Sequence, residues 1–491
     1  MPHAALASLC ALGAITNPLA PPAAEGVAQL EMAPVELELP AGASRTAYRG
    51  SLRVRLVRAD PESAEIGVDV WRFPAAEGVP KDRPPIFQLH GGPGWPGLQP
   101  ERIDWERQIA PLVAHADLVI VGQRGIGTSE PDTSCDRFAS GIAPGLPENE
   151  EMAALAEACK ACRAHWESQG YDLRGFNVIE AAADVDDARR LLGYDEIVVM
   201  GGSFGSHWGM AVMRFHSEAV ARAVLHGMEG PDHTYDSPHG ILAALERIAA
   251  QAEASPRLEG RLPEEGLIEA LRTVIRDVEE DPFELEVGDA LVRIDADGLR
   301  GLARGYEHRV NSRETVGGWP RDVVRLFEGD FEPVARALAR QRSSGGGLPT
   351  ASFFQLDCGS GITRERLERY TTDPAIEVVG DLAAWYEALC PAWDADLGED
   401  FRAGFTTDIP TLVVQGTWDV STPYENAVEM LPSFEDVHFV SVEGGTHGAF
   451  REAMGFDPAF EEAVMAFVAE GTREGLPAEI VLPPIEWMSG W

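Results

Sequence analysis

The sequence contains almost no lysine. Only Lys81 and Lys160 occur among 40 basic residues, against 80 acidic ones, which gives a formal net charge of −40 at pH 7. A surface this negative repels phosphate backbones, so nucleic acid is not expected as a partner. The same charge would attract cationic groups such as the amino terminus of a peptide, although solubility or salt tolerance accounts for it equally well.

The sequence also lacks a long hydrophobic run. No stretch reaches the roughly 18 apolar residues that a membrane-spanning helix requires, so no span is predicted. Hydrophobic residues make up 45% of the 491 positions and charged residues 24%, as in ordinary globular proteins. These values exclude the disordered and collagenous classes, and the length predicts two or three domains.

The N-terminus resembles a secretory signal peptide that lacks its basic start. Ala4–Ile15 is apolar and is followed by small and proline-rich residues through Ala24, but no Lys or Arg precedes the stretch. Residues 1–25 are therefore expected to be a signal peptide or a disordered N-terminus. Secretion or export to a periplasm is the expected location, and the cytoplasm is the alternative.

Cysteine is scarce, and its spacing argues against a metal site. The six cysteines are Cys10, Cys135, Cys159, Cys162, Cys358 and Cys390. Cys159 and Cys162 form a single Cys-x-x-Cys without a second pair or a histidine at zinc-finger spacing. Without Cys10, five cysteines remain and one stays unpaired. An exported protein would form one or two disulfides, and we predict one between Cys358 and Cys390, which lie near the return of the chain to the core.

Short segments rich in Val and Ile alternate with helical patterns along most of the chain. This alternation predicts a mostly parallel sheet with helices on both faces. An antiparallel pair is expected at 52–57 and 66–73, and buried strands at 86–89, 118–121, 197–200, 223–225, 411–414 and 438–442. Apolar residues at helical spacing predict a crossover helix over Val178–Leu192.

The strand rhythm stops between Tyr235 and Trp393. Helical patterns replace it at 242–253, 266–278 and 323–340, and a Ser/Gly-rich link occupies 343–347. Because strands resume at Thr411, residues 235–394 are predicted to be a mainly helical lid inserted between two parts of one core, 45–234 and 395–485.

A Gly-x-Ser-x-Gly motif lies where a strand should turn into a helix. Gly201-Gly202-Ser203-Phe204-Gly205 follows the predicted strand at 197–200 and precedes a helical pattern. In this context the motif forms a tight elbow that exposes the serine hydroxyl above the sheet. Ser203 is therefore the predicted nucleophile.

An acid and a histidine follow the last two predicted strands. Asp419 comes after the strand at 411–414, and His447 after the strand at 438–442. The chain order Ser, Asp, His is the order found in α/β hydrolases, where loops at the carboxyl ends of parallel strands converge. We predict a triad with His447 as general base and Asp419 as the acid that orients it.

A glycine-rich loop, His90-Gly91-Gly92-Pro93-Gly94, closes the strand at 86–89. In α/β hydrolases this loop supplies one oxyanion donor, and the residue after the nucleophile supplies the other. Gly92 and Phe204 are the expected donors through their backbone amides. His90 is expected to anchor the loop by hydrogen bonds rather than to react.

With these motifs, the chain resembles the proline iminopeptidase family of α/β hydrolases, and especially its tripeptidyl aminopeptidase branch. The similarity extends to Gln123–Ser129, although Gly122 stands where the family usually has Asp, so the acidic brace there is expected to be missing. It covers about Pro84–Gly227 and Cys390–Gly448. The predicted lid matches nothing in this family that we can place.

The resemblance implies acyl transfer from a peptide with a free amino terminus, without a metal or organic cofactor. Such an enzyme needs an acidic anchor for the ammonium group, and Glu229, after the predicted strand at 223–225, is the candidate. A structural role for Glu229, a carboxylesterase acting on small esters, and a binding protein that retains the fold are the alternatives. The sequence leaves the oligomeric state open.

Overall fold

The computed structural model describes residues 28–39, 44–96, 98–99, 104–142, 146, 148–288, 290–303, 310–343 and 348–488. The predicted signal peptide at 1–25 and most of the Ser/Gly-rich link lie outside these ranges.

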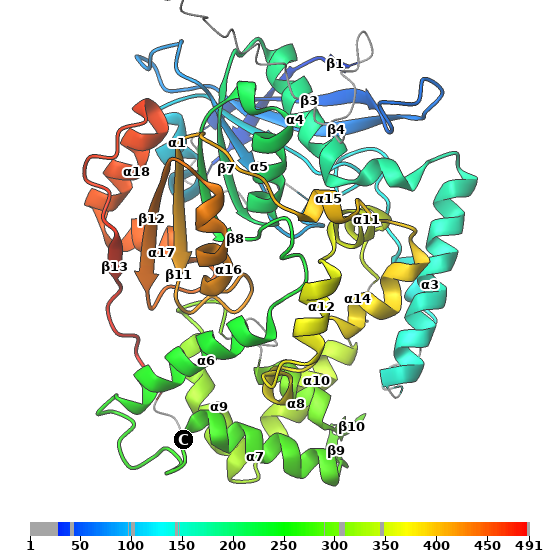
Figure 1. Ribbon diagram of the computed structural model, residues 1–491, viewed down its shortest axis with the longest axis vertical. Coiled ribbons are helices and arrows are strands. Elements are labelled where there is room, and N and C mark those ends of the chain that lie inside the picture. The colour runs from blue at the N-terminus through cyan, green and yellow to red at the C-terminus, as the bar shows by residue number, and fades with distance from the viewer. Residues whose placement is uncertain are drawn as a thin grey trace, which may run out of the picture.

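One sheet of eleven strands forms the centre of the molecule (Figure 1). Its strands run in the order β1-β3-β4-β6-β5-β7-β8-β11-β12-β13, and β2 also pairs with β3. The strands are β1 Gln29–Leu30, β2 Ala33–Glu38, β3 Ser44–Arg55, β4 Glu65–Phe73, β5 Ile86–Leu89, β6 Leu118–Val121, β7 Ile197–Ser203, β8 Val220–Met228, β11 Thr411–Gly416, β12 Val437–Glu443 and β13 Glu479–Val481. Pairing is antiparallel from β1 to β6 and parallel from β6 to β13.

Both faces of the parallel part are covered, so the residues of its inner strands β6, β7 and β11 are almost all buried. Successive residues of β7 alternate between two hydrophobic cores: Val199 packs with the core that includes α4 and α5, and Val198 packs with the core that includes α17 and α18. The predicted mostly parallel sheet with helices on both faces is confirmed.

The helical elements around it are η3 Trp105–Ile109, α1 Ala110–Val113, α2 Asp136–Ala139, α3 Glu148–Ser168, η4 Leu173–Phe176, α4 Val178–Leu192, α5 Phe204–Phe215, η5 Ser217–Ala219, α16 Tyr424–Met430, η9 Leu431–Ser433, α17 Ala449–Phe456 and α18 Pro458–Glu470.

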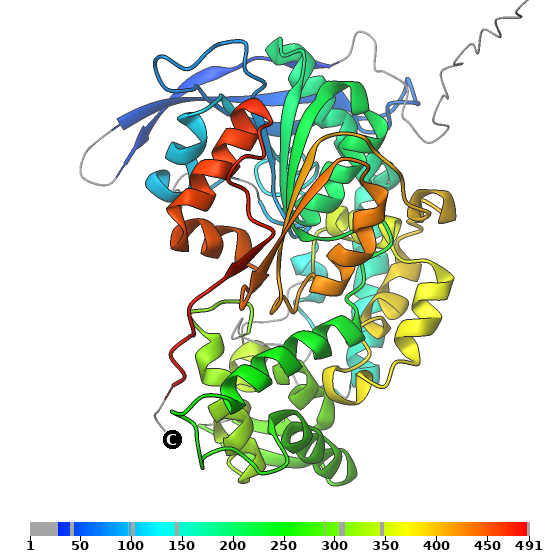
Figure 2. The same ribbon diagram turned by 60° about the vertical axis from the view of Figure 1, so that its left-hand side comes forward.

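Between β8 and β11 the chain is mainly helical. Its elements are α6 Pro238–Glu253, α7 Leu267–Glu280, β9 Phe283–Val287, β10 Ala290–Ile294, α8 Ala296–Ala303, η7 Val316–Gly318, α9 Trp319–Phe327, α10 Glu332–Ser343, α11 Ala351–Ser360, α12 Arg364–Thr371, α13 Ile376–Val379, α14 Ala384–Leu389, η8 Cys390–Ala392 and α15 Glu399–Arg402. Helices α6 to α9 lie together below the sheet, whereas α11 and α14 lie beside it next to α3 (Figures 1 and 2).

These two helical groups belong to different hydrophobic cores. Side chains of α6 to α10 and α13 form a core of their own, which we call the lid core. Residues of α11 and α14, including Phe354 and Leu389, instead pack in one of the two cores of the sheet. The second group is therefore fixed to the body of the protein.

The single helix expected over 323–340 is wrong. Helix α9 ends at Phe327 and α10 begins at Glu332, because Gly329 adopts a left-handed conformation with φ 85°. The amides of Gly329 and Asp330 donate to the carbonyls of Leu326 and Arg325, which closes α9 with a glycine cap.

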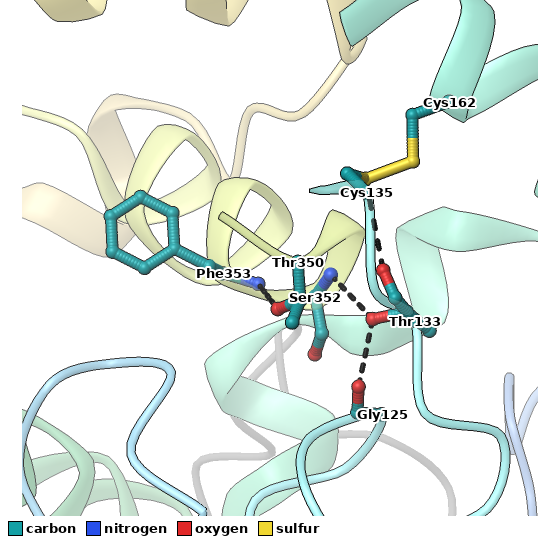
Figure 3. The surroundings of a disulfide bond; sticks show 7 residues. All are labelled: Gly125, Thr133, Cys135, Cys162, Thr350, Ser352 and Phe353. Atoms are coloured by element: carbon teal, nitrogen blue, oxygen red, sulfur yellow. Dashed lines mark hydrogen bonds between the residues drawn. A yellow bond between two sulfur atoms is a disulfide. The ribbon is translucent and has the colours of Figure 1, made fainter. Parts of the chain in front are cut away.

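Two disulfides stabilise the region around α11. The predicted Cys358–Cys390 bond is confirmed and joins the end of α11 to η8. A second bond, Cys135–Cys162, ties the loop before α2 to α3 (Figure 3). Cys159 is buried and has a free thiol.

The start of α11 is attached to the same part of the core. Thr133 Oγ1 donates to the carbonyl of Gly125 at 2.8 Å and accepts from the amide of Ser352 at 3.0 Å (Figure 3). The carbonyl of Thr133 also accepts from the amide of Ala351 at 2.9 Å. Helix α11 is thus held at its first turn by Thr133 and at its last turn by a disulfide.

Within the described part of the chain, no helix combines the length and apolar character needed to cross a membrane.

Candidate active site

Ser203 stands at the turn between β7 and α5 in a conformation that side chains rarely adopt. Its φ and ψ are 58° and −135°, a strain of about 1–3 kcal/mol that surrounding structure must offset. A Cβ atom on Gly201 would lie 2.1 Å from the carbonyl oxygen of Gly205, and one on Gly205 would lie 2.1 Å from the oxygen of Leu89. The two glycines of the motif are therefore required for the strand and helix to approach this closely.

Asp419 and His447 are joined by hydrogen bonds past the ends of β11 and β12. His447 Nδ1 lies 3.1 Å from Asp419 Oδ1 and 3.0 Å from Oδ2. The fully buried carboxylate also accepts from the backbone amides of Ser421 and Thr422, each at 2.9 Å, and from the side chains of Thr422 and Gln415. Both carboxylate oxygens of Asp419 are thus satisfied.

The two groups shift each other's pKa in opposite directions. Burial alone would raise the pKa of Asp419, but the charge and hydrogen bonds of His447 and the amides of Thr422 and Ser421 hold it below its ordinary value. Burial alone would lower the pKa of His447, but the charge and hydrogen bond of Asp419 raise it above its ordinary value. The pair therefore stabilises a protonated imidazole.

Ser203 lies at the same edge of the sheet as this pair. It is the register partner of Met228 on β8, and a Cβ atom on the preceding residue, Gly227, would lie 3.2 Å from the His447 ring. Among the described residues no hydrogen bond joins Ser203 to His447. Such bonds are often long before substrate binds. The structure thus brings the acid and the histidine into contact and places the serine beside them.

The glycine-rich loop approaches Ser203 closely. A Cβ atom on Gly91 would lie 2.9 Å from Ser203 Cβ, and Gly92 has a φ of 116° that favours glycine. The backbone amides of Gly92 and Phe204 donate to no acceptor among the described residues. Both expected donors are therefore available beside the nucleophile.

Gln123, rather than His90, holds this loop. Its Nε2 donates to the carbonyls of His90 and Gly91 at 3.1 and 2.9 Å, and its Oε1 accepts from the amide of Gly94 at 2.9 Å. The His90 ring makes no hydrogen bond to a described residue, and burial lowers its pKa to about 4. The expected anchoring by His90 is wrong. Gln123 follows β6 and begins the motif Gln123–Ser129. That motif is the sequence feature that could have indicated its role in holding the loop.

The acidic brace expected to be missing at Gly122 is supplied from another strand. Asp69 on β4 accepts from Thr128 Oγ1 at 2.7 Å, and its backbone carbonyl accepts from the amide of Gly122 at 2.7 Å. A side chain on Gly122 would meet that carbonyl, since a Cβ atom there would lie 3.1 Å from it. Gly122 therefore leaves space for Asp69.

Glu229 is buried directly beyond β8 and is connected to the nucleophile through one side chain. Ser206 Oγ donates to the carbonyl of Ser203 at 2.7 Å and accepts from the amide of Glu229 at 2.9 Å. Oε1 of Glu229 is buried without a hydrogen-bond partner. The backbone of Glu229 is therefore joined to the Ser203 turn through Ser206, and its carboxylate Oε1 lies 4.0 Å from His207 Nδ1 on α5.

A second buried carboxylate, Asp357 of α11, accompanies Glu229. Asp357 Oδ2 accepts from the hydroxyl of Tyr386 at 3.0 Å, while its Oδ1 is buried without a partner. Tyr386 stacks on Tyr235 with ring centroids 4.0 Å apart. We call Glu229 and Asp357 the acidic pair. Sequence reasoning missed Asp357, because it lies in the helical region where no motif marks it.

The acidic pair is held in an environment that disfavours its charge. Burial, followed by the charges of Asp357 and Asp236, raises the pKa of Glu229 well above its ordinary value. Burial, followed by the charge of Asp236, also raises the pKa of Asp357 well above its ordinary value, although the Tyr386 hydrogen bond opposes the rise. His207 Nδ1 lies 4.0 Å from Glu229, but burial lowers the His207 pKa to about 4, so this imidazole is neutral. It does not supply a compensating charge.

Comparisons with known proteins support the fold. A model of the alpha/beta hydrolase fold matches residues 84–256, and a model described as TAP-like protein matches residues 376–478. No curated protein sequence is significantly similar to this chain.

Solved structures resemble the chain only distantly. A meta-cleavage product hydrolase from Pseudomonas fluorescens IP01 is 12% identical over 83% of this chain and 96% of its own, with a TM-score of 0.36. An esterase from Exiguobacterium antarcticum is 13% identical over 82% and 96%, with a TM-score of 0.36. An esterase from Thermogutta terrifontis is 15% identical over 85% and 97%, with a TM-score of 0.34. Likenesses this weak carry no argument about function.

The chain is a hydrolase of the α/β-hydrolase fold. Its C-terminal part, over residues 376–478, is a TAP-like region.

Proposed function

We propose that the protein is a serine hydrolase that acts through an acyl-enzyme and releases single residues or short peptides from free amino termini, as proline iminopeptidases do. The hydrogen-bonded Asp419 and His447 beside the Ser203 turn support the serine-hydrolase chemistry. The acidic pair beside the same turn supports the preference for an amino terminus.

The reaction begins when Ser203 Oγ attacks the carbonyl carbon of the scissile bond. His447 Nε2 takes the hydroxyl proton, and Asp419 orients the imidazole and stabilises its charged form. The backbone amides of Gly92 and Phe204 bind the oxyanion. His447 then gives the proton to the leaving amine, and water hydrolyses the acyl-enzyme in the same two steps.

The acidic pair is the observation that carries the substrate preference. Each of its two carboxylates has one buried oxygen without a hydrogen-bond partner, and a buried polar atom is normally paired. An ammonium group offers three N–H donors and a positive charge, which would satisfy both oxygens and offset the repulsion between them. A blocked amino terminus or a simple ester offers no such charge.

The helical region between β8 and β11 acts as a lid in this proposal. Asp357 on α11 of that region raises the pKa of Glu229 through its charge, and a Cβ atom on Gly94 of the glycine-rich loop would lie 3.4 Å from Phe353 on the same helix. The region would therefore both complete the amine site and exclude water during acyl transfer.

Export from the cytoplasm is also part of the proposal. The two disulfides, Cys135–Cys162 and Cys358–Cys390, support it, because such bonds persist in oxidising compartments.

Replacement of Glu229 tests the preference for free amino termini. A charge-assisted hydrogen bond contributes about 1.5–3 kcal/mol, so Glu229→Gln should lower kcat/KM about 10- to 100-fold for unblocked substrates. The substrates are chromogenic aminoacyl, dipeptidyl and tripeptidyl amides, their N-acetylated forms, and short-chain acyl esters. N-acetylated amides and esters should be almost unaffected. Glu218→Gln, on the exposed turn before β8, is the matched control and should behave as wild type.

Three outcomes would contradict the proposal. An equal loss on blocked and unblocked substrates would make Glu229 a structural residue. A wild-type preference for blocked substrates or esters would replace the aminopeptidase with a carboxylesterase. Folded wild-type protein that a fluorophosphonate does not label at Ser203 would indicate a binding protein that has retained the fold.

A further inference from the structure

The residues on either side of Asp419 are packed in the lid core rather than in the cores of the sheet. Trp418 and Val420 are both buried among side chains of α6, α7 and α9. Asp419 itself faces the opposite way, toward His447. The turn that carries the proposed catalytic acid is therefore anchored in the helical region.

The chain after β13 reaches the same place. Residues Leu482–Met488, which we call the C-terminal strap, run from the edge of the sheet down to the helices below it (Figures 1 and 2). Trp487 is buried in the lid core, with its ring centroid 6.5 Å from that of Trp418. The amide of Met488 donates to the carbonyl of Gly317 at 2.9 Å, and a Cβ atom on Gly317 would lie 2.7 Å from the Glu486 carbonyl. The strap is thus closely fitted to η7.

Arg313 connects the strap, the Asp419 turn and the His447 loop. Its guanidinium donates to the backbone carbonyls of Gly444 and Pro483 and lies 5.8 Å from the centre of the Trp418 ring. Gly444 precedes His447 by three residues, and Pro483 belongs to the strap. A single side chain from the segment before η7 therefore contacts all three.

The two catalytic loops are also bonded directly to each other. The amide of Gly444 donates to Thr417 Oγ1 at 3.0 Å, and the amide of Trp418 donates to the carbonyl of Gly445 at 2.8 Å. These bonds fix the loops relative to each other, but they do not fix the pair relative to the helices. Arg313 and Trp487 contribute to that second attachment, together with Arg247 of α6, which donates to the carbonyl of Thr417 at 3.1 Å.

We propose that Arg313 is a positioning residue. Through its contacts with Gly444 and Trp418, it holds the Asp419 turn and the His447 loop in the geometry needed for proton transfer. The C-terminal strap supports Arg313 in this position. The inference rests on the proposed serine-hydrolase function. Its consequence is that the attachment of the lid core and the strap sets the alignment of Asp419 with His447. Displacements of about 1 Å in such an alignment can cost 10²-fold in rate.

Arg313→Ala is the primary test, and Arg257→Ala is its control. Arg257 contacts the strap only at the exposed side chain of Glu486, at 3.8 Å, and does not reach either loop. The readout is the second-order rate of fluorophosphonate labelling at Ser203 in the full-length protein, measured across the pH range in which histidine titrates. This readout needs no knowledge of the substrate.

We expect Arg313→Ala to label about 10- to 100-fold more slowly than wild type. Its acid limb should also move to lower pH, because a looser contact with Asp419 no longer raises the pKa of His447. Arg313→Lys keeps the charge but cannot contact both carbonyls as arginine does. Its labelling rate should therefore lie between those of wild type and Arg313→Ala. Trp487→Ala should change the rate and the acid limb in the same direction by a smaller amount, and Arg257→Ala should not differ from wild type.

The outcomes are separable. Wild-type rate and pH dependence in Arg313→Ala would overturn the inference. A slower rate with an unchanged acid limb and a lowered melting temperature would also overturn it, because the residue would then be merely structural. If Arg313→Ala does not fold, Trp487→Ala decides by the same criteria. Wild-type protein that is folded but not labelled would overturn the proposed function and this inference together.

Discussion

Two sets of buried carboxylates lie near Ser203, and they differ in their hydrogen-bond partners and in the direction in which their pKa values are shifted. Asp419 accepts hydrogen bonds on both oxygens, contacts an imidazole at 3.0 Å, and has a pKa below its ordinary value. Glu229 and Asp357 each keep one buried oxygen without a partner, and their pKa values lie well above the ordinary range. Burial is similar in the two places, so the difference lies in the partners.

In the proposed function, this difference separates two tasks: orienting the base and binding the amino terminus of the substrate. An acid whose partners are all provided by the protein is fixed in its ionised form and can orient a base. Acids that keep a buried oxygen without an internal partner are stabilised when a cation arrives from outside. Environments that shift the pKa values of chemically similar groups apart are a common sign of distinct roles in one site.

The largest effect is expected from removing the reacting residues while leaving the acidic pair intact. Ser203→Ala and His447→Ala should each lower kcat by about 10⁴-fold or more, because the members of a triad act as a unit. Binding of a peptide with a free amino terminus should persist, and equilibrium dialysis of an unblocked peptide measures it. Either variant retaining more than about a tenth of wild-type kcat would refute the assignment.

A pair of isosteric substitutions sharpens the comparison. Asp419→Asn should lower kcat by about 10³- to 10⁴-fold. It should also shift the acid limb of the pH profile to lower pH, because His447 must be neutral to act as a base and Asp419 is what raises its pKa. Asp357→Asn should instead raise KM for unblocked substrates without moving the acid limb of kcat. Parallel kcat and KM profiles against pH measure both, and identical profiles for the two variants would remove the distinction.

The smallest expected effect is on stability, and its sign differs between the two sets. A carboxylate whose pKa is raised on folding favours the folded state at low pH and loses that contribution as pH rises through the raised value. In Glu229→Gln this position has no carboxyl that can ionise, so the stability that wild type loses at neutral pH is kept. Its melting temperature at neutral pH should exceed that of wild type by about 1–3 °C.

The opposite sign is expected for Asp419→Asn, which should melt lower than wild type at neutral pH. A lowered pKa contributes stability at pH values above the group's ordinary pKa, and the asparagine cannot supply it. Calorimetry at neutral pH and near pH 4 tests both signs: the Glu229→Gln difference should shrink at the lower pH, whereas the Asp419→Asn difference should persist near pH 4 and shrink only in more acidic solution, as the lowered pKa of Asp419 is approached. A lower melting temperature for Glu229→Gln at neutral pH would contradict the account.

The parts of the site that follow strands could be predicted from the sequence. Ser203, Asp419 and His447 each come directly after an apolar segment, and parallel strands bring such positions to one edge. Asp357 could not be found in this way, because it lies on α11, whose packing against the core depends on contacts far apart in the chain. Likewise, Asp69 occupies the space that Gly122 leaves, and only the pairing of β4 with β6 brings them together.

Local sequence was also insufficient for some details within correctly predicted regions. The apolar pattern over 323–340 continues across Gly329, so periodicity alone joined α9 and α10. The His90 ring could anchor a loop by hydrogen bonds, but the side chain of Gln123 forms the hydrogen bonds to the loop carbonyls instead. In one case a backbone glycine cap ends α9, and in the other the side chain of Gln123 bonds the loop; neither leaves a periodic pattern in the sequence.

The attachment of α11 at both ends has a consequence for the maturation of the enzyme. Ser203, Asp419 and His447 lie at or beyond the ends of strands, and neither of the two disulfides joins the segments that carry them. Asp357 lies on a helix whose last turn is fixed by Cys358–Cys390 and whose first turn rests on Thr133, close to Cys135–Cys162. In the proposed function, a newly made chain would therefore carry its nucleophile before its amine site is complete. The proposed selectivity for amino termini would then depend on oxidation of these cysteines, which the proposed export would allow.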